Sequence, residues 1–302
     1  MGQKVLITGA SGLIGSRLTQ LLLARKYEVV HLGRTARQGL VPCFQWNIDR
    51  GELDLRALDG VNAIIHLAGA GIADKRWNDQ RKREIRESRT RSTRLLFDVL
   101  NTARHEVITF VSASAIGYYG FQSREMIFQE DAAPGSDFLA SVVKDWEAEV
   151  DAIARLDMRV VKIRIGIVLD REGGALKEMM KPIQWWVGAP LASGKQMMSW
   201  IHRDDLCNLF AFALEHEQLR GAYNGVAPHP VSNKAFTKLL ATVLQKPLWL
   251  PLVPGFVVNL LVGEMAQLVT NGSHVDSAKT EAAGFKFQFP ELEPALRDLL
   301  KA

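Results

Sequence analysis

The sequence predicts an α/β protein built on a doubly wound parallel sheet, followed by a smaller mixed α/β domain. Two observations lead to this fold class. Over the first 165 residues, short continuous apolar runs alternate with helical patterns. Such runs are typical of parallel strands covered on both faces, and right-handed crossovers then wind the sheet in both directions. The last third of the chain is interrupted repeatedly by Pro and Gly, which indicates a less regular unit.

The elements follow in order along the chain. Strands are expected at 5–7, 29–32, 43–46, 63–67, 107–111 and 159–168. Helices are expected after the first strand (Leu13, Leu18, Leu21, Leu22), from Ile85 to Val99, and at 138–154, 236–244 and 294–300. Short strands at 200–202 and 222–224 are expected to return to the first domain. The predicted division is therefore 1–168 with about 196–226 for the first domain, and 169–195 with 227–302 for the second.

Composition excludes several classes of protein. The 302 residues are 47% hydrophobic and 23% charged, as in ordinary globular proteins rather than disordered or coiled-coil chains. No apolar run approaches the roughly 20 residues of a membrane helix, so we expect no membrane partner. The first strand runs straight into a glycine turn, which does not fit a secretory signal. Cys43 and Cys207 lie far apart and the seven histidines lack metal spacing, so we expect a reducing cytoplasm and no metal.

The positive charge is concentrated in one segment. The net charge is +4, but residues 75–94 hold nine Lys or Arg against three acids, which makes +6 and leaves −2 for the rest. One basic segment favours a local anionic ligand. No helix-turn-helix or aromatic RNA motif accompanies it, so we expect no nucleic-acid partner.

A glycine turn follows the first strand. Gly9, Gly12 and Gly15 are spaced three apart between the strand and the first helix. Gly9 permits a tight turn, Gly12 lets a pyrophosphate approach, and Gly15 allows close packing of helix and strand. We expect phosphates at the free N–H groups of the turn and the helix N-terminus. The alternative is a purely structural turn. The predicted cofactor contacts here are Gly9, Ser11, Gly12, Leu13, Ile14 and Gly15.

The end of the second strand predicts which dinucleotide is bound. An NAD site has Asp or Glu there for the ribose hydroxyls, whereas this chain has Gly33-Arg34-Thr35-Ala36-Arg37. Arg34, helped by Thr35 and Arg37, can bind a 2′-phosphate with charge-assisted hydrogen bonds. We therefore expect NADP(H). The alternative is that Arg34 is a solvated loop residue.

At this point the chain resembles the extended short-chain dehydrogenase/reductases, whose nucleotide-binding domain is of the Rossmann type. The glycine turn, Leu67-Ala68-Gly69 and Ser112-Ala113-Ser114 carry the resemblance. It is most similar to an atypical sugar-nucleotide epimerase-like branch, and this similarity covers nearly the whole chain. The further motifs that match are 67–77, 88–89, 114–120, 137–140, 146–147, 164–169, 173–176, 194–196, 199–202 and 283–287. The resemblance implies cofactor contacts at Leu67, Ala68, Gly69 and Ser112, but no settled substrate.

The resemblance also implies a catalytic Ser, Tyr and Lys. Ser114 matches the serine that orients the substrate oxygen, with Ser112 as second choice; a turn-capping role is the alternative. The best register of the Tyr-x-x-x-Lys pattern places Ala140 at the tyrosine and Lys144 at the lysine. Alanine cannot move a proton, which puts the ordinary mechanism in doubt. Lys144 is expected at the nicotinamide ribose, or else as a solvated helix residue.

Two tyrosines offer a replacement for the missing one. Tyr118 and Tyr119 directly follow Ser114, so one of them is a candidate acid/base; the alternative is an aromatic wall of the pocket. Substrate contacts are expected at Trp77, Arg89, Ser114 and Tyr118, with Arg76, Lys82 or Arg89 holding an anionic group. Two further groups are expected to be structural, His66 in the core and the segment His202, Asp204 and Asp205.

The resulting prediction is an NADP(H)-dependent oxidoreductase or epimerase-like enzyme. Its substrate would be a small carbonyl or carbinol compound, for which the basic segment favours an anionic group, and a sugar nucleotide is what the resemblance implies. The alternative is a non-catalytic NADP(H)-binding redox sensor, favoured by Ala140. A monomer or a weak dimer is expected, because the helix from Asn78 to Leu100 is highly charged.

Overall fold

The computed structural model describes residues 3–121 and 126–301. Its centre is an eight-stranded sheet with the order β12-β8-β6-β5-β1-β2-β3-β4. All neighbouring strands in it are parallel except β3 and β4. The strands are β1 Lys4–Thr8, β2 Glu28–Gly33, β3 Cys43–Asn47, β4 Glu52–Leu53, β5 Ala63–His66, β6 Thr109–Ala115, β8 Arg159–Ile165 and β12 Gly221–Gly225. The strand order reverses at β1, which confirms the doubly wound fold.

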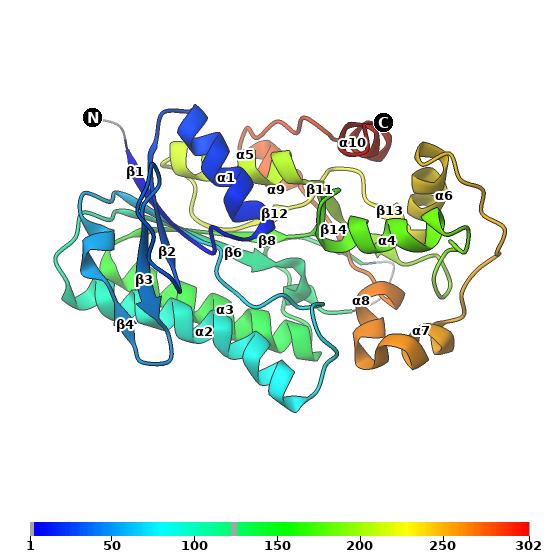
Figure 1. Ribbon diagram of the computed structural model, residues 1–302, viewed down its shortest axis with the longest axis horizontal. Coiled ribbons are helices and arrows are strands. Elements are labelled where there is room, and N and C mark those ends of the chain that lie inside the picture. The colour runs from blue at the N-terminus through cyan, green and yellow to red at the C-terminus, as the bar shows by residue number, and fades with distance from the viewer. Residues whose placement is uncertain (1–2, 122–125, 302) are drawn as a thin grey trace.

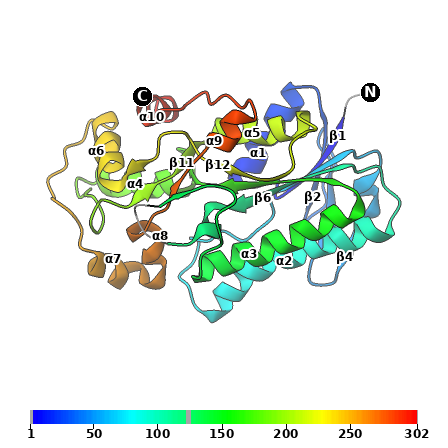
Figure 2. The same cartoon turned by 180° about the vertical axis from the view of Figure 1, so that it is seen from behind.

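Helices cover both faces of this sheet. In Figure 1, α1 (Leu13–Ala24), α5 (Arg203–Glu215) and α9 (Ala278–Ala282) lie above it, and α2 (Asp79–Thr102) and α3 (Phe138–Ile153) lie below it. Figure 2 shows the same layers from behind. The strands are apolar on both faces for this reason: Val5, Leu6 and Ile7 of β1 are fully buried.

The C-terminal region is built from short elements. Three two-stranded sheets pair β9 (Ile167–Leu169) with β11 (Trp200–His202), β10 (Met197–Met198) with β13 (Val231–Ser232), and β7 (Ile127–Phe128) with β14 (His274–Val275). The helices are α4 Gly174–Gln184, α6 Asn233–Val243, α7 Gly255–Val262, α8 Gln267–Thr270 and α10 Leu292–Leu299. A second apolar cluster forms around Trp200, Phe236 and Leu296.

Three expectations about strands need correction. The run 159–168 is two strands, because the chain leaves the sheet at Gly166, where an added Cβ would lie 2.4 Å from the Ser199 carbonyl oxygen. The strand at 200–202 consequently pairs with β9 outside the main sheet, whereas β12 does join it. The strand expected at 107–111 runs instead from Thr109 to Ala115, so Ser112 and Ser114 lie within β6.

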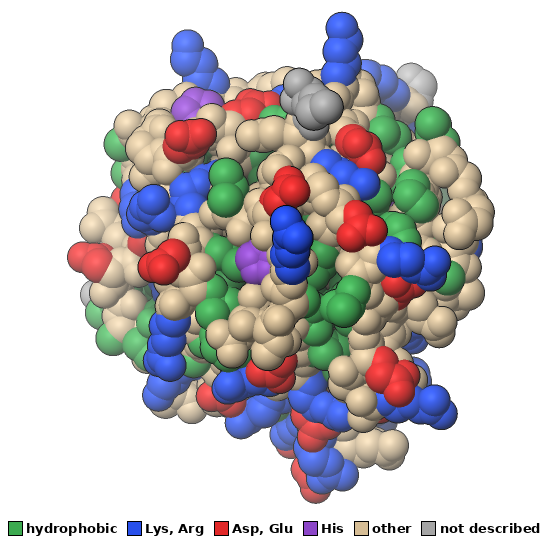
Figure 3. Space-filling model, turned by 90° about the vertical axis from the view of Figure 1, so that its left-hand side faces the viewer, with side chains coloured by type: hydrophobic (Ala, Val, Ile, Leu, Met, Phe, Trp, Pro, Cys, Tyr) green, Lys and Arg blue, Asp and Glu red, His purple; other side chains and the backbone are tan. Residues whose placement is uncertain are grey.

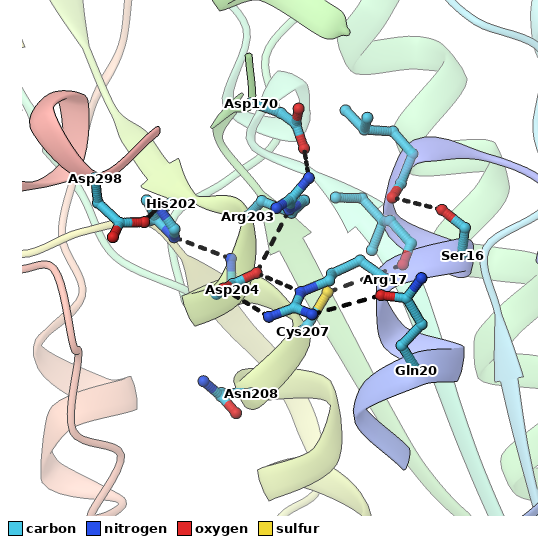
Figure 4. A network of polar contacts seen from close by, with 12 residues as sticks. Ser16, Arg17, Gln20, Asp170, His202, Arg203, Asp204, Cys207, Asn208 and Asp298 are labelled. Carbon is cyan, nitrogen blue, oxygen red and sulfur yellow. Dashed lines mark hydrogen bonds and ion pairs between the residues drawn. The ribbon is translucent and has the colours of Figure 1, made fainter. Parts of the chain in front are cut away.

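A polar network fastens α1 to the start of α5 (Figure 4). Arg17 donates two hydrogen bonds to Asp204, from Nε to Oδ1 over 2.7 Å and from Nη2 to Oδ2 over 2.9 Å. Arg203 binds the fully buried Asp170, and the His202 ring accepts a hydrogen bond from the Asp204 backbone N–H. Asp205 accepts two backbone N–H bonds from the C-terminal segment. These contacts join the two regions of the chain and make the 202–205 segment structural.

The basic segment is mostly neutralised at the surface. Arg86, Arg91 and Arg94 of α2 pair with Asp145, Asp49 and Glu149. Figure 3 shows Lys and Arg mixed with Asp and Glu toward the lower end of its face, on the side where α2 lies in Figure 1. Most of its charge therefore belongs to a solvated helix surface.

Among residues 3–121 and 126–301, no helix is both long and apolar enough to cross a membrane. The same part of the chain contains no group of three His, Cys, Asp or Glu placed to hold a metal ion.

Candidate functional site

The glycine turn has no room for a side chain at Gly9 or Gly15. Gly9 has a φ of +67°, and an added Cβ would lie 2.8 Å from the Leu67 carbonyl carbon and oxygen. At Gly15 an added Cβ would lie 2.4 Å from the Gly9 oxygen and 2.6 Å from the Ala10 Cα. Helix α1 can approach β1 and β5 closely only because both positions are glycine.

The N-terminus of α1 is open to an anion. Its N-cap is Gly12, which offers no side-chain hydrogen bond, and the first turn contains no acidic residue. Ser11 and Gly12 are exposed, and Leu13 and Ile14 are half-buried, so the turn faces the surface at the carboxyl edge of the sheet. Uncapped N–H groups and the positive end of the helix dipole suit a pyrophosphate. The residues present therefore fit a dinucleotide.

The end of β2 opens onto a cavity of about 530 Å³. Arg34 lines it, while Thr35 and Arg37 are exposed nearby; Arg37 pairs through its backbone with Cys43. The rest of the lining comes from β3, the turn after it and α2: Gln45, Trp46, Asn47, Ile48, Asp49, Gln80, Arg83, Glu84, Glu87, Ser88 and Arg91. The β3 residues were missed by sequence reasoning, although β2 and β3 are neighbours and end at the same edge.

The loop after β5 is held against the glycine turn. The Thr8 hydroxyl accepts hydrogen bonds from the backbone N–H groups of Leu67 (3.1 Å) and Ala68 (3.2 Å), and lies 2.8 Å from His66 Nδ1. His66 is fully buried, and burial lowers its pKa to about 3, so the ring is neutral. Leu67 and Ala68 thus border the turn, and His66 is the core residue that the sequence predicted.

The predicted catalytic serines are buried, and both already donate their hydroxyl protons. Ser112 is fully buried and donates its hydroxyl to the Ala113 carbonyl oxygen. Ser114 is 3% exposed and donates its only O–H to Glu147 Oε1 over 2.6 Å. A hydroxyl whose proton is committed in this way can accept a further hydrogen bond but cannot donate one.

Glu147 and Arg164 form the centre of a buried polar network that sequence reasoning did not single out. Arg164 binds Glu147 through Nε (2.8 Å) and Nη2 (3.0 Å), and Lys162 Nζ lies 3.4 Å from the same carboxylate. Burial opposes the charge of Glu147, but these partners outweigh it and hold its pKa below the usual value. Both residues lie in motifs of the resemblance, and that signal could have found them.

The two candidate tyrosines have different surroundings. Tyr119 is fully buried, donates to Asn224 Oδ1 over 2.6 Å and receives Arg164 Nη1 over 3.0 Å. Burial raises the pKa of Tyr119 to about 12, so it is a poor proton carrier near neutral pH. Tyr118 is half-buried, and the Arg164 Cζ stands 3.6 Å from its ring centroid. Tyr118 has no hydrogen-bond partner for its phenol among the residues described.

Helix α3 presents a different register from the predicted one. An added Cβ on Gly117, in the turn η2 (Ile116–Tyr119), would lie 3.6 Å from Leu139 Cβ and 3.7 Å from Val143 Cγ2. Residues 139 and 143 are one turn apart and face the loop after β6. Lys144 is exposed, and Ala140 is fully buried. The place of Lys144 at the nicotinamide ribose stays a prediction, and the two positions of α3 that pack against the loop after β6 are apolar.

The predicted substrate residues lie along α2 and the loop before it. Trp77 donates its indole N–H to the Ile72 oxygen over 2.9 Å and meets the Phe138 ring edge-on. Arg76 binds the Leu260 carbonyl oxygen, and Lys82 pairs with Glu264, so both are engaged by the C-terminal region. Arg89 is 9% exposed and lies beneath Gly69.

The fold and the glycine turn at the switch point define the class of the protein, a dinucleotide-binding α/β protein. Comparison with known proteins gives the family. The model of the NAD dependent epimerase/dehydratase family matches residues 5–224, and a domain of unknown function (DUF1731) matches residues 253–299. The chain is 38% identical to the chloroplastic epimerase family protein SDR39U1 homolog of Arabidopsis thaliana, over 98% of this chain and 86% of that one. The epimerase family protein YfhF of Bacillus subtilis is 34% identical, over 98% and 97%.

Solved structures agree with this assignment. Human epimerase family protein SDR39U1 (isoform2), solved with NADPH, superposes with a TM-score of 0.88 at 33% identity, and 99% of each chain is covered. A Bacillus cereus UDP-glucuronic acid 4-epimerase shares the fold, with a TM-score of 0.80 at 18% identity over 99% of each chain. The chain therefore belongs to the NAD dependent epimerase/dehydratase family.

Proposed function

We propose that the protein is an NADP(H)-dependent oxidoreductase or epimerase-like enzyme acting on a small carbonyl or carbinol compound. The observation that carries the cofactor part is Arg34, which lines the cavity at the end of β2 where an NAD site has an acid. The human relative solved with NADPH supports the same cofactor. Gly9, Gly12 and the N-terminus of α1 would hold the pyrophosphate.

When bound, the nicotinamide supplies or accepts a hydride at the substrate carbon. The chain then has to supply or accept a proton at the substrate oxygen. Tyr118 is the group available for this step, because its phenol is half-buried and has no partner among the described residues. The Arg164 guanidinium stands over its ring in a cation–π contact, which fixes the orientation of the ring. Ser114 can accept one hydrogen bond from a substrate hydroxyl but remains bound to Glu147.

A second function is favoured by a separate observation. Leu139 and Val143 occupy the positions of α3 that face the loop after β6, and neither can carry a proton or a charge. A protein that binds NADP(H) without turning over a substrate would tolerate this. The non-catalytic redox sensor is therefore the alternative proposal, and turnover distinguishes the two.

The test is a comparison of Tyr118→Phe with wild type. NADPH affinity is measured by calorimetry, and NADPH oxidation is followed at saturating cofactor with a panel of small carbonyl compounds. Loss of the proton carrier is expected to lower kcat by roughly 100-fold or more, with unchanged NADPH affinity. Tyr27→Phe, on the surface beside Glu215, is the matched control. Equal kcat in Tyr118→Phe would reject this role, and tight NADPH binding without any turnover would favour the sensor.

A further inference from the structure

Among the described residues, Arg89 is a buried arginine without a carboxylate partner; Arg159 is another, but four backbone carbonyl oxygens accept hydrogen bonds from its guanidinium. Arg89 donates a hydrogen bond from Nη1 to the Ile85 carbonyl oxygen of its own helix (2.8 Å), and its Cζ stands 5.3 Å from the Trp146 ring centroid. No carboxylate among the described residues pairs with it. Burial, and then the positive charge of Arg81, lower the pKa of Arg89 to about 10, so it still carries its charge at neutral pH. An isolated buried guanidinium is costly, and proteins rarely keep one without a use.

The neighbours of Arg89 add two further donors without acceptors. Arg81, two turns earlier on α2, is 6% exposed, pairs with Glu84 and Asp74 and donates to the Gly71 carbonyl oxygen, but its Nε is buried with no partner. The Nε1 of Trp146, the ring beneath Arg89, is also buried with no partner. Nearly all buried polar atoms in proteins are satisfied, and these two atoms, Arg81 Nε and Trp146 Nε1, are both donors. An anionic group with oxygen acceptors would satisfy these donors and neutralise Arg89.

In the loop after β5, only Gly69, which has no side chain, covers Arg89 at this point. An added Cβ on Gly69 would lie 3.2 Å from Arg89 Cζ and 3.3 Å from its Cγ, so the guanidinium lies directly against the glycine. Gly69 is exposed although Arg89 is nine-tenths buried. The neighbouring backbone is fixed, because Ala70 N–H donates to Ser88 Oγ over 3.0 Å. This loop lies at the carboxyl edge of the sheet, where ligands of such folds bind.

We propose that Arg89, with Arg81 and Trp146, forms the subsite for an anionic group of the substrate, a phosphate or a carboxylate. This inference rests on the proposed function, since it assigns the substrate class of that site. It selects Arg89 among three predicted cations, because Arg76 and Lys82 are held by the C-terminal region. A phosphate of the cofactor has the same chemistry, so the experiment must separate the two sources.

The first arm uses orthophosphate as the probe. Thermal unfolding is measured with phosphate or chloride at constant ionic strength, with and without NADP⁺, for wild type, Arg89→Met and Arg104→Met. Arg104 is an exposed arginine just beyond α2 and serves as control. Phosphate should raise the Tm of wild type and Arg104→Met but not of Arg89→Met, and Arg89→Lys should keep part of the response. Without phosphate, Arg89→Met should be as stable as wild type or more stable, because an uncompensated charge is removed.

Two results in this arm would overturn the subsite. One is a phosphate response that is absent in wild type or equal in Arg89→Met. The other is a large loss of stability of Arg89→Met in chloride, since that would make Arg89 a structural residue. Neither measurement depends on turnover.

The second arm titrates NADPH into the same variants. Unchanged affinity in Arg89→Met supports a substrate anion, whereas a loss of roughly tenfold or more would assign Arg89 to a cofactor phosphate and overturn the proposal. Failure of wild type to bind NADPH would reject the proposed function instead. A phosphate response that depends on Arg89 would then still establish the anion site, so the two failures are distinguishable.

Discussion

The two sides of the candidate site are built by different means. On the cofactor side, Gly9 and Gly15 bring the backbone of β1, α1 and the β5 loop into close contact, and the helix N-terminus stays open. On the side of the chemistry, Ser114, Glu147 and Arg164 satisfy one another inside a buried network. The N–H groups of the first side have no side-chain partner, whereas the polar groups of the second side are already paired with one another. The cofactor side therefore depends on close backbone approach at glycines, whereas the other side depends on paired buried charges.

The largest effect on stability is expected from removing the Glu147 carboxylate from the buried network. Glu147→Ala leaves Arg164, which is 3% exposed, without its carboxylate, and should lower the free energy of unfolding by about 3–5 kcal/mol. Urea denaturation measures this. Glu149→Ala is the matched control on the same helix, because its partner Arg94 is exposed and such pairs contribute at most about 1 kcal/mol.

A double variant tests the interpretation of that loss. Glu147→Leu combined with Arg164→Met removes both charges, and should therefore be less destabilising than Glu147→Ala alone. The single variants Glu147→Leu and Arg164→Met are measured beside it. If their losses of unfolding free energy add up to the loss in the double variant, the network stabilises the fold through something other than charge pairing.

The second prediction breaks the cofactor side. In Gly15→Ala the new methyl group meets the Gly9 oxygen at 2.4 Å, and α1 must move away from the turn. We expect a cost of about 3 kcal/mol and loss of NADPH binding, because the pyrophosphate cradle changes shape. Denaturation and calorimetric titration measure the two effects. Gly51→Ala, where an added Cβ meets nothing within 4 Å, should cost about 1 kcal/mol and leave NADPH binding intact.

This asymmetry explains what could be predicted from the sequence. The glycine turn, β1 and α1 were predictable because close backbone approach and strand periodicity leave direct marks on residue types. The register of α3 was not, because Ala140 with Lys144 and Leu139 with Val143 are equally spaced, and only the folded structure shows which pair packs against Gly117. The commitment of the Ser114 hydroxyl to Glu147 depends on a contact 33 residues away in sequence. Local patterns do not encode such contacts.

The third prediction sharpens the cofactor side without disturbing the fold. Arg34→Ala removes an exposed side chain that lines the cavity, so stability should not change. NADPH affinity should fall by roughly 10- to 100-fold, the value of a charge-assisted contact of about 1.5–3 kcal/mol, while NADH affinity stays constant. Calorimetric titration with both cofactors measures this. Arg50→Ala, exposed outside the cavity, is the control; an Arg34→Ala protein that still prefers NADPH to NADH would contradict the assignment.

The last prediction concerns His66, which is fully buried at the end of β5. Its Nδ1 faces the Thr8 hydroxyl, which already accepts two backbone N–H groups and so donates to the ring; its Nε2–H can then donate to Thr93 Oγ1, which lies 3.1 Å away. Only the neutral ring fits these partners. Its pKa is about 3 in the folded protein and 6.5 when unfolded, so its contribution to stability is complete above pH 6.5 and is lost as the pH falls toward 3.

The expected slope is about 1.4 kcal/mol per pH unit below pH 6.5, or about 2 kcal/mol between pH 6.5 and 5.0. Urea denaturation at a series of pH values measures it. That range lies above the depressed pKa of Glu147, so the carboxylate network stays charged throughout. His66→Gln should flatten the slope. What remains is the share of His31 and His202, whose pKa values burial also lowers, and the opposite share of Glu130 and Asp205, whose pKa values burial raises. If His66→Gln keeps the full slope, another group titrates in this pH range. The contact between Thr8 and the loop after β5 would then not depend on a neutral imidazole.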